Sequence, residues 1–368
     1  MRIALVCETF LPDVNGVTTT LCRLLEHLQH TGHEALLFAP HGGPTEYAGT
    51  PIIPLGGMPL PMYPEVKLTP PQPGLTAHLR RFQPDVLHMV GPVVAGAVVP
   101  FVARKLRLPL IGSYHTDFGA YSHHYGLGFL QRGVNGWLRW IHNRCRITLC
   151  PSTYTLQSLR QVGFRRLRIW GRGVDTERFH PRHRSEAWRT QVGLQSGETL
   201  LLYVGRLAAE KRVELLPEAL RGLDKARLVI VGDGPYRAEL ERRCVGLPVH
   251  FTGYLKGDAL ATAFASADLF VFPSDTDTFG QVIQEAMASG LPVVGARSGG
   301  SLDLIREGQT GSLFAPGVAS DIRAKLRPLL ADPTMRTSLG QAGRRFAEGR
   351  SWPLVMGELM GYYQRAHW

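Results

Sequence analysis

The feature that most constrains this chain is a regular alternation of short apolar segments with amphipathic ones. The short apolar segments are typical of strands that are buried on both faces of a sheet. Helical patterns at residues 20–30 and 76–82 separate some of them. This alternation predicts an α/β fold with parallel, doubly wound sheets. We expect strands at residues 3–6, 35–38, 86–89, 110–114 and 147–150 in a first series, and at 199–204, 227–231, 250–251, 269–272 and 292–295 in a second.

Two series of strands predict two Rossmann-like domains with a cleft at the carboxyl ends of their strands. The connector lies near residues 171–181, where two glycines and a proline end one periodic region before the next begins. We therefore place the domains at residues 1–172 and 173–351. The proline-dense segment 58–71 is expected to be an irregular loop rather than a strand.

A polar loop that leads directly from a strand into a helix marks the candidate ligand site. Residues 273–279 are too polar and turn-rich to continue the preceding strand, and 280–289 has the apolar spacing of a helix. The first N–H groups of this helix lack intrahelical partners and favour an anion. Asp277 and Glu285 add two carboxylates, which need hydroxyl groups as partners. A nucleotide sugar offers both a diphosphate and hydroxyls; the alternative is that the acids merely cap and solvate the helix.

This segment resembles the acid-x7-Glu motif of the retaining glycosyltransferases of family 4. Asp277 occupies the first position, where many members have Glu, and Glu285 occupies the second. The resemblance implies that Asp277 and the amides of Thr278, Phe279 and Gly280 hold the donor sugar. It also implies that Glu285 binds the ribose of the nucleotide.

The resemblance covers nearly the whole chain and implies the GT-B fold, in which two Rossmann-like domains face each other across a cleft. It further implies that a C-terminal helix within residues 352–368 crosses back to the first domain. Within the family, the segments 274–280 and 170–175 look like the branch of GDP-mannose-dependent α-mannosyltransferases and sulfoquinovosyl-diacylglycerol synthases.

A second motif in the C-terminal half offers cations for a diphosphate. Gly205 and Arg206 follow a predicted strand, and Lys211 comes five positions after Arg206. An arginine fork and a mobile lysine can neutralise the phosphates of a leaving nucleotide, and the resemblance assigns them this role. For Lys211 alone, a solvated helix position is the alternative.

The nucleobase is assigned only through the resemblance. It places the base against the backbone around Gly253, Tyr254 and Leu255. Backbone groups distinguish bases poorly, so this region does not choose between UDP and GDP.

In the N-terminal half, two residues carry the resemblance. Gly16 is the single glycine of the loop after the first strand, and the family uses such a glycine to face the donor diphosphate. His115 stands where a predicted strand ends, at the position of the family's active-site histidine. The alternatives are a glycine needed only for its turn and a packed histidine. A metal site formed by His115, His123 and His124 is disfavoured because their spacing fits no common motif.

Composition sets the cellular expectations. The 368 residues include five cysteines without a C-x-x-C pair, which argues against a disulfide framework or a zinc site. The N-terminal apolar run is too short for a signal peptide, and the charge-free run 86–103 is broken by glycines and prolines, so no membrane span is expected. We expect a cytoplasmic protein, peripheral on the inner face of the cell membrane.

The net charge of +11 favours an anionic neighbour. No nucleic-acid motif accompanies it, so anionic lipid ranks above nucleic acid. The segment 137–146 combines two tryptophans with several arginines and is predicted to be a helix with Trp137, Trp140 and Ile141 on one side. Such a helix suits a headgroup interface; the alternative is that its tryptophans belong to the core.

The predicted function is transfer of a hexose, with retention, from a nucleotide diphosphate sugar to a lipid-type acceptor. We expect mannose from GDP-mannose; a UDP-sugar-dependent diacylglycerol glycosyltransferase is the alternative. His115, Asp277, Arg206 and Lys211 are the expected catalytic residues, with no metal and no cofactor. Two other classes stay open at this point: a nucleotide-sugar epimerase or hydrolase, and a non-catalytic anion-binding protein.

Overall fold

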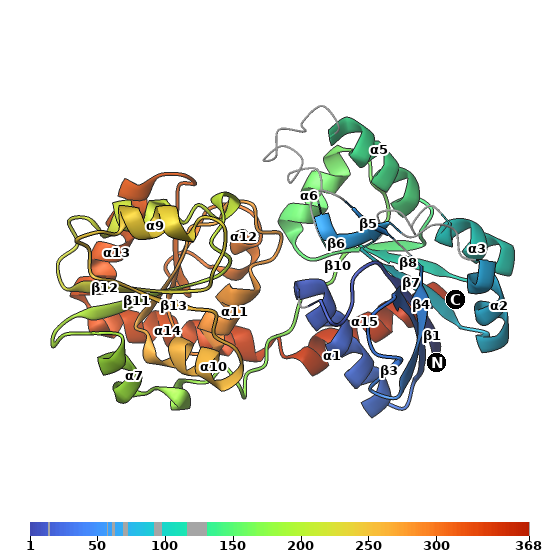
Figure 1. Cartoon of the computed structure of the whole chain (residues 1–368), viewed down its shortest axis with the longest axis horizontal. Helices are drawn as coiled ribbons and strands as arrows, with labels where there is room; N and C mark the ends of the chain where they lie inside the picture. Colours follow the sequence, from blue (N-terminus) through green and yellow to red (C-terminus); the bar gives the residue numbers. More distant parts are fainter. Residues whose placement is uncertain are drawn as a thin grey trace. The chain divides into compact units, whose positions relative to one another are not determined.

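The computed structural model describes residues 1–13, 15–56, 58–60, 63–68, 73–91, 98–115 and 131–367. The chain divides into two compact units (Figure 1). Unit 1 consists of Met1–Arg172 with Pro353–Trp368, and unit 2 is Gly173–Trp352. Each is described by itself below.

Unit 1 is built on an eight-stranded sheet with the order β10-β9-β8-β7-β1-β2-β4-β3. Its strand pairs are parallel except the edge pair β3–β4. The strands are β1 (Arg2–Cys7), β2 (Glu34–Pro40), β3 (Glu46–Tyr47), β4 (Thr50–Leu55), β7 (Val86–Val90), β8 (Leu110–Ser113), β9 (Ile147–Cys150) and β10 (Leu167–Ile169). The helices are α1 (Gly16–His30), α2 (Pro73–Phe82), α3 (Val99–Leu106), α5 (Gln131–His142), α6 (Thr153–Gln161) and α15 (Trp352–His367).

Unit 2 has a six-stranded parallel sheet with the order β13-β12-β11-β14-β15-β16. Its strands are β11 (Thr199–Val204), β12 (Ala226–Val231), β13 (Val249–Gly253), β14 (Leu269–Phe272), β15 (Val293–Ala296) and β16 (Gly311–Phe314). Its α-helices are α7 (Glu186–Gln191), α8 (Leu215–Leu220), α9 (Arg237–Arg243), α10 (Gly257–Ser266), α11 (Gln281–Ala288), α12 (Ser301–Leu304), α13 (Ala319–Ala331) and α14 (Pro333–Glu348). Two short 3-10 helices are η3 (Pro181–His183) and η4 (Ala209–Lys211).

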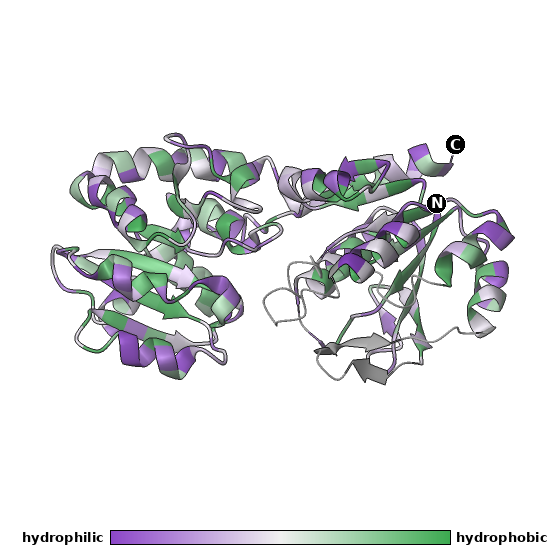
Figure 2. Cartoon of the chain, turned by 90° about the horizontal axis from the view of Figure 1, so that it is seen from above, coloured by the Kyte–Doolittle hydropathy of each residue, from purple (hydrophilic) through white to green (hydrophobic). Residues whose placement is uncertain are grey.

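The central strands are buried on both faces, as their apolar sequences predict. Every residue of β11 and β14 is buried. Figure 2 shows the strands of unit 2 largely in green, whereas several helices alternate green with purple. The predicted α/β class with two parallel-sheet units is confirmed.

The C-terminal helix α15 packs in unit 1, as expected (Figure 1). Its Tyr363 hydroxyl lies 2.7 Å from Nδ1 of His88 on the buried strand β7, and Nε2 of that histidine lies 2.5 Å from the Ser113 hydroxyl on β8. Arg146 donates to the Ala366 carbonyl at 2.6 Å. These contacts attach the helix to the sheet.

The segment 58–71 departs from the prediction. It contains a two-stranded antiparallel pair, β5 (Met58–Leu60) with β6 (Tyr63–Leu68), rather than an irregular loop. In a two-stranded pair each strand has one edge without a neighbour, so proline can occupy positions whose N–H would face outward. The density of proline therefore excluded a central strand, but not an edge strand.

Candidate functional site

The loop from β14 to α11 forms the centre of the site in unit 2. Gly280 has a left-handed φ of 84° and directly precedes the helix, so the chain turns sharply there. The Asp277 carboxylate accepts from the N–H groups of Gly280 at 3.0 Å and Phe279 at 3.4 Å. Two of the amides that the sequence predicts for a ligand thus donate to the nearby carboxylate of their own loop, and the first residues of α11 receive no side-chain cap.

Asp277 also binds the predicted lysine. The Lys211 ammonium donates to its other carboxylate oxygen at 2.7 Å, from the end of η4. Burial opposes ionisation of this carboxyl, but Lys211 and the backbone donors outweigh it and lower the pKa of Asp277 from 3.8 to about 2. The sequence predicted both residues for one site, and the fold brings them together.

Arg206 is paired in the same manner. Its guanidinium forms an ion pair with Glu210, which is buried and lies one turn further on. Both cations that the sequence predicts for phosphate thus contact carboxylates of unit 2.

Glu285 lies one turn into α11 and is half-buried. Burial raises the pKa of this carboxyl from 4.5 to about 8, although Gln281 and the charge of Arg178 oppose the rise. A carboxyl that is protonated near neutral pH can both donate and accept. Such a group is suited to a pair of vicinal hydroxyls.

Two glycines of the loop after β15, Gly299 and Gly300, lie against the backbone of Asp277. The Gly300 N–H donates to the Asp277 carbonyl at 2.8 Å. Gly299 has a φ of 58°, and a Cβ at this position would lie 2.3 Å from the same carbonyl oxygen. The predictions did not include them, although a Ser-Gly-Gly sequence after a buried strand indicates a close backbone approach.

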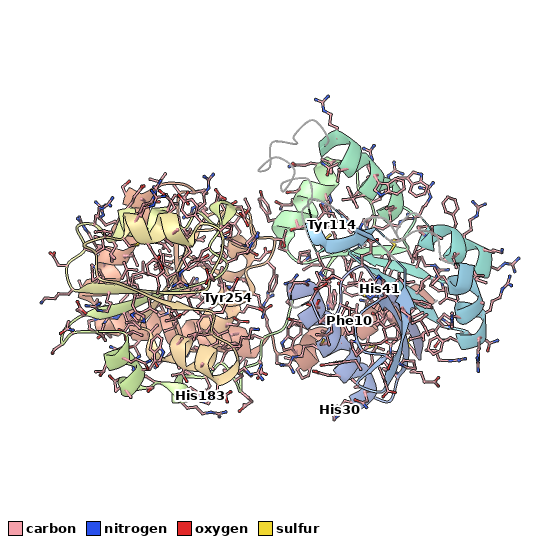
Figure 3. The ribbon with its side chains drawn as sticks, in the orientation of Figure 1. Phe10, His30, His41, Tyr114, His183 and Tyr254 are labelled. Carbon is pink, nitrogen blue, oxygen red and sulfur yellow. The ribbon has the colours of Figure 1, made fainter. Side chains whose placement is uncertain are left out.

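The remaining predicted donor residues lie at or just after the ends of β11 and β13 of the same sheet, which are separated by β12. Gly205 follows β11, and its N–H donates to the Val231 carbonyl at 3.0 Å. Gly253 ends β13 with a φ of 72°, and Leu255 packs on the core of unit 2. Tyr254, labelled in Figure 3, is 66% exposed and directs its hydroxyl to the Asp233 carbonyl at 3.3 Å.

His115 lies two residues after the end of β8 in unit 1 and is buried. Burial lowers its pKa, and the positive charge of Arg172 lowers it further. Its ring meets the indole of Trp170 edge to face, with centroids 6.0 Å apart. The imidazole is therefore neutral and oriented. His123 and His124 lie outside the described residues.

Gly16 begins α1, and its bare Cα faces a side chain that the sequence did not suggest. A Cβ at Gly16 would lie 2.3 Å from a terminal nitrogen of Arg172. The space that we expected for a phosphate is thus taken by a guanidinium. Within unit 1, the missing side chain of Gly16 thus makes room for Arg172.

Comparisons with known proteins agree with this arrangement. The family description Glycosyltransferase Family 4 matches residues 14–178, and Glycosyl transferases group 1 matches residues 184–346. A GDP-mannose-dependent alpha-mannosyltransferase of Corynebacterium glutamicum is 38% identical over 99% of this chain and 88% of its own length. The chain is a family 4 glycosyltransferase.

Two further likenesses support this assignment. Sulfoquinovosyl transferase SQD2 of Arabidopsis thaliana is 38% identical to the glycosyltransferase over 95% of this chain and 71% of its own length. Anabaena HepE, solved in complex with UDP, is 20% identical and superposes with a TM-score of 0.82 over 99% of this chain and all of that one. The predicted GT-B fold and hexosyltransferase class are confirmed.

Sequence reasoning missed four polar residues of the glycosyltransferase. Two contact predicted ones: Glu210 pairs with Arg206, and Arg172 lies against Gly16. The other two, Arg212 and Asp275, pair with each other, with Arg212 Nε 3.2 Å from Asp275 Oδ2, and are close in sequence to Lys211 and Asp277. Each looks like an ordinary surface charge in the sequence, because its partner is distant along the chain or belongs to a short irregular turn.

Proposed function

We propose that this glycosyltransferase moves mannose from GDP-mannose to a lipid-type acceptor, with retention at the anomeric carbon. The Lys211–Asp277 pair at the start of α11 carries the proposal, because it places a cation and a hydroxyl acceptor at one point. The 38% identity to a protein named for GDP-mannose supports the donor. The likeness to SQD2 keeps a UDP-sugar donor as the second candidate.

In this proposal, the donor diphosphate draws Lys211 and Arg206 from Asp277 and Glu210. Phosphate oxygens take over their N–H donors as charge develops on the leaving nucleotide. Asp277 then accepts from hydroxyls of the donor sugar, and Glu285 holds the ribose. These cations take the place that a metal ion fills in other transferases, so transfer is proposed to need no metal.

His115 contributes as a neutral imidazole. A neutral ring can accept from one sugar hydroxyl through one nitrogen, and its lowered pKa keeps it neutral through the physiological range. No residue of this set is proposed as a covalent nucleophile. The acceptor hydroxyl attacks on the face that the nucleotide leaves, and the leaving phosphate takes its proton.

The decisive experiment offers the purified protein radiolabelled GDP-mannose or UDP-glucose, with and without a lipid extract. Incorporation into lipid that depends on both GDP-mannose and the extract is the expected result, and it should survive EDTA. Incorporation from UDP-glucose alone would select the second candidate. Release of free sugar without incorporation would contradict transfer and favour a hydrolase.

Peripheral contact with an anionic membrane is the second part of the proposal. Trp137 and Trp140 of α5 stack with ring centroids 5.4 Å apart, and Phe101 of α3 packs against Trp140. Phe101 and Trp137 are 57% and 41% exposed. Arg144 lies over the Trp140 ring at 3.7 Å, which places charge beside an aromatic surface. We call Phe101, Trp137 and Trp140 the aromatic patch.

The structure corrects part of the predicted surface. Ile141 is fully buried and does not share the exposed side with the tryptophans. Arg139 and Arg146 donate to the carbonyls of Val162 and Ala366, so they hold the fold of unit 1. In the part of the chain that the structure describes, no helix combines the length and apolar character that crossing a bilayer requires.

Vesicle co-sedimentation tests the aromatic patch. Binding to anionic vesicles should fall as salt rises, since each cation near the surface contributes only about 1 kcal/mol. The Phe101→Ala/Trp137→Ala variant should lose most of this binding. Val245→Ala, which truncates an apolar side chain of unit 2 that is 81% exposed, should keep it. Equal sedimentation with neutral vesicles, or an unaffected double variant, would contradict the proposal.

A further inference from the structure

Two loops of unit 2 are joined by a row of contacts at the donor site. They follow β11 and β14, which are neighbours in the sheet. The Thr276 hydroxyl donates to the Glu210 carbonyl at 3.0 Å, and Lys211 donates to Asp277 at 2.7 Å. Consecutive residues of one loop therefore bind consecutive residues of the other.

A third contact completes the row. Arg212 Nε donates to Asp275 Oδ2 at 3.2 Å. The Asp275 side chain is only 16% exposed, and its carbonyl accepts from the Ser298 hydroxyl at 2.8 Å, so this residue is fixed from two sides. Asp275 thus offers a rigid anchor for the loop that carries Lys211.

The backbone of Arg212 has a conformation that costs free energy. Its φ of 53° lies in the left-handed region, which costs free energy for an arginine and which glycine or asparagine would adopt more readily. The ion pair with the Asp275 carboxylate, whose side chain is 16% exposed, is one interaction that offsets this cost.

We propose that Arg212 and Asp275 are positioning residues for the donor diphosphate, an inference that rests on the proposed function. Lys211 must leave Asp277 to reach a phosphate, and one of the two side-chain ion pairs between the loops is then lost, while the Thr276–Glu210 hydrogen bond remains. The Arg212–Asp275 pair does not depend on the donor. It holds the loops at a fixed spacing while Lys211 changes its partner, so the ammonium and the Asp277 carboxylate stay placed for the diphosphate and the sugar.

A double-mutant cycle of Arg212→Gly and Asp275→Asn tests this role. Glycine suits the left-handed backbone, so the substitution removes the ion pair without adding strain. Each single variant should raise the KM for the donor about tenfold, which lies within the range of coupling energies found between contacting residues. Because the two residues act as one pair, the KM of the double variant should not exceed the higher of the two single-variant values. The kcat should change less than KM, and Arg212→Lys should recover part of the loss.

Arg243→Gln is the matched control. Its side chain is 41% exposed, against 40% for Arg212, and it pairs with Glu239 at 2.8 Å on α9. This variant should keep the wild-type KM. Strictly additive losses in the cycle, or an equal loss in the control, would overturn the positioning role.

Hydrogen exchange provides a readout that needs no donor. The Phe279 and Gly280 amides are held by Asp277, so both should exchange faster in Arg212→Gly than in the wild type or in Arg243→Gln. If exchange is faster in Arg212→Gly but the wild-type protein transfers no mannose, the proposed function is rejected and the positioning role is kept. Unchanged exchange together with an unchanged KM would reject the positioning role.

Discussion

Lys211 contacts the Asp277 carboxylate, so its removal has two effects. The Lys211→Ala variant loses a preorganised charge for the leaving diphosphate and leaves Asp277 without its cation. We expect kcat to fall by about two to three powers of ten, as for loss of one charge-stabilising donor. Lys325→Ala, which removes a surface lysine paired with Glu307, is the control for steady-state kinetics. Wild-type turnover in Lys211→Ala would reject the diphosphate role.

Glu285 makes stability depend on pH in an unusual direction. Its folded pKa of about 8 exceeds the ordinary 4.5, so between these values the folded state holds a proton that the unfolded state has lost. Stability from this group is complete below pH 4.5 and disappears as pH rises towards 8. Glu285→Gln removes the ionisation, so its thermal midpoint should exceed that of the wild type at pH 8 and match it near pH 4.5. Parallel pH profiles would contradict this assignment.

The chemical types of the site residues could be predicted, but their partners could not. Asp277, Lys211 and Glu285 follow from their spacing along a strand-loop-helix unit and from a known motif. The sequence did not show that Asp277 accepts from the Phe279 and Gly280 amides of its own loop, because this contact depends on the turn at Gly280. It also did not show that Gly16 faces Arg172, since 156 positions separate them (172 − 16).

At the scale of elements, the loop after β15 fixes the loop after β14. Gly299→Ala would place a Cβ 2.3 Å from the Asp277 carbonyl, in addition to the left-handed strain of about 1 kcal/mol. We expect donor affinity to fall and thermal stability to decrease. Gly317→Ala is the matched control, because its φ of 77° carries the same strain with no atom within 4 Å of the added Cβ. Equal effects of both substitutions on donor affinity, measured by calorimetry, would remove Gly299 from the site.

Most elements could be predicted where burial alone determines them. The strands β1, β7, β11 and β14 are continuous apolar runs, and each lies within the interior of its sheet. The edge strand β10 was missed because only one of its three residues is buried. An edge strand is held by backbone pairing on one side, and backbone pairing leaves little trace in side-chain pattern.

At the scale of the whole molecule, buried histidines make unit 1 sensitive to acid. Burial lowers the pKa of His88 from 6.5 to about 3 and that of His142 to about 4. The unfolded chain therefore binds more protons than the folded one as pH falls from 6.5 to about 3, and stability is lost in that window.

Tyr363→Phe removes the hydroxyl that joins α15 to His88, so it should lower stability by about 1–3 kcal/mol at neutral pH. Denaturant unfolding measures this loss. The substitution Tyr362→Phe, whose hydroxyl bonds the exposed Ile169 carbonyl, should cost less. If both substitutions lower the free energy of unfolding equally, the buried Tyr363–His88 contact stabilises the protein no more than the exposed one.

The chain enters and leaves unit 2 at adjacent positions. Val174 pairs with Ser351 in a parallel bridge, and its N–H donates to the Arg350 carbonyl at 3.0 Å. Unit 2 is thus an insertion within unit 1, whose sheet is complete in sequence by Ile169 but lacks α15 until residues 353–367 are made. On the ribosome, unit 2 is available as one continuous stretch, whereas unit 1 must wait for a helix translated about 180 residues after its last strand (352 − 169 = 183). Until then, His88 on the buried strand β7 lacks the Tyr363 hydroxyl as a partner.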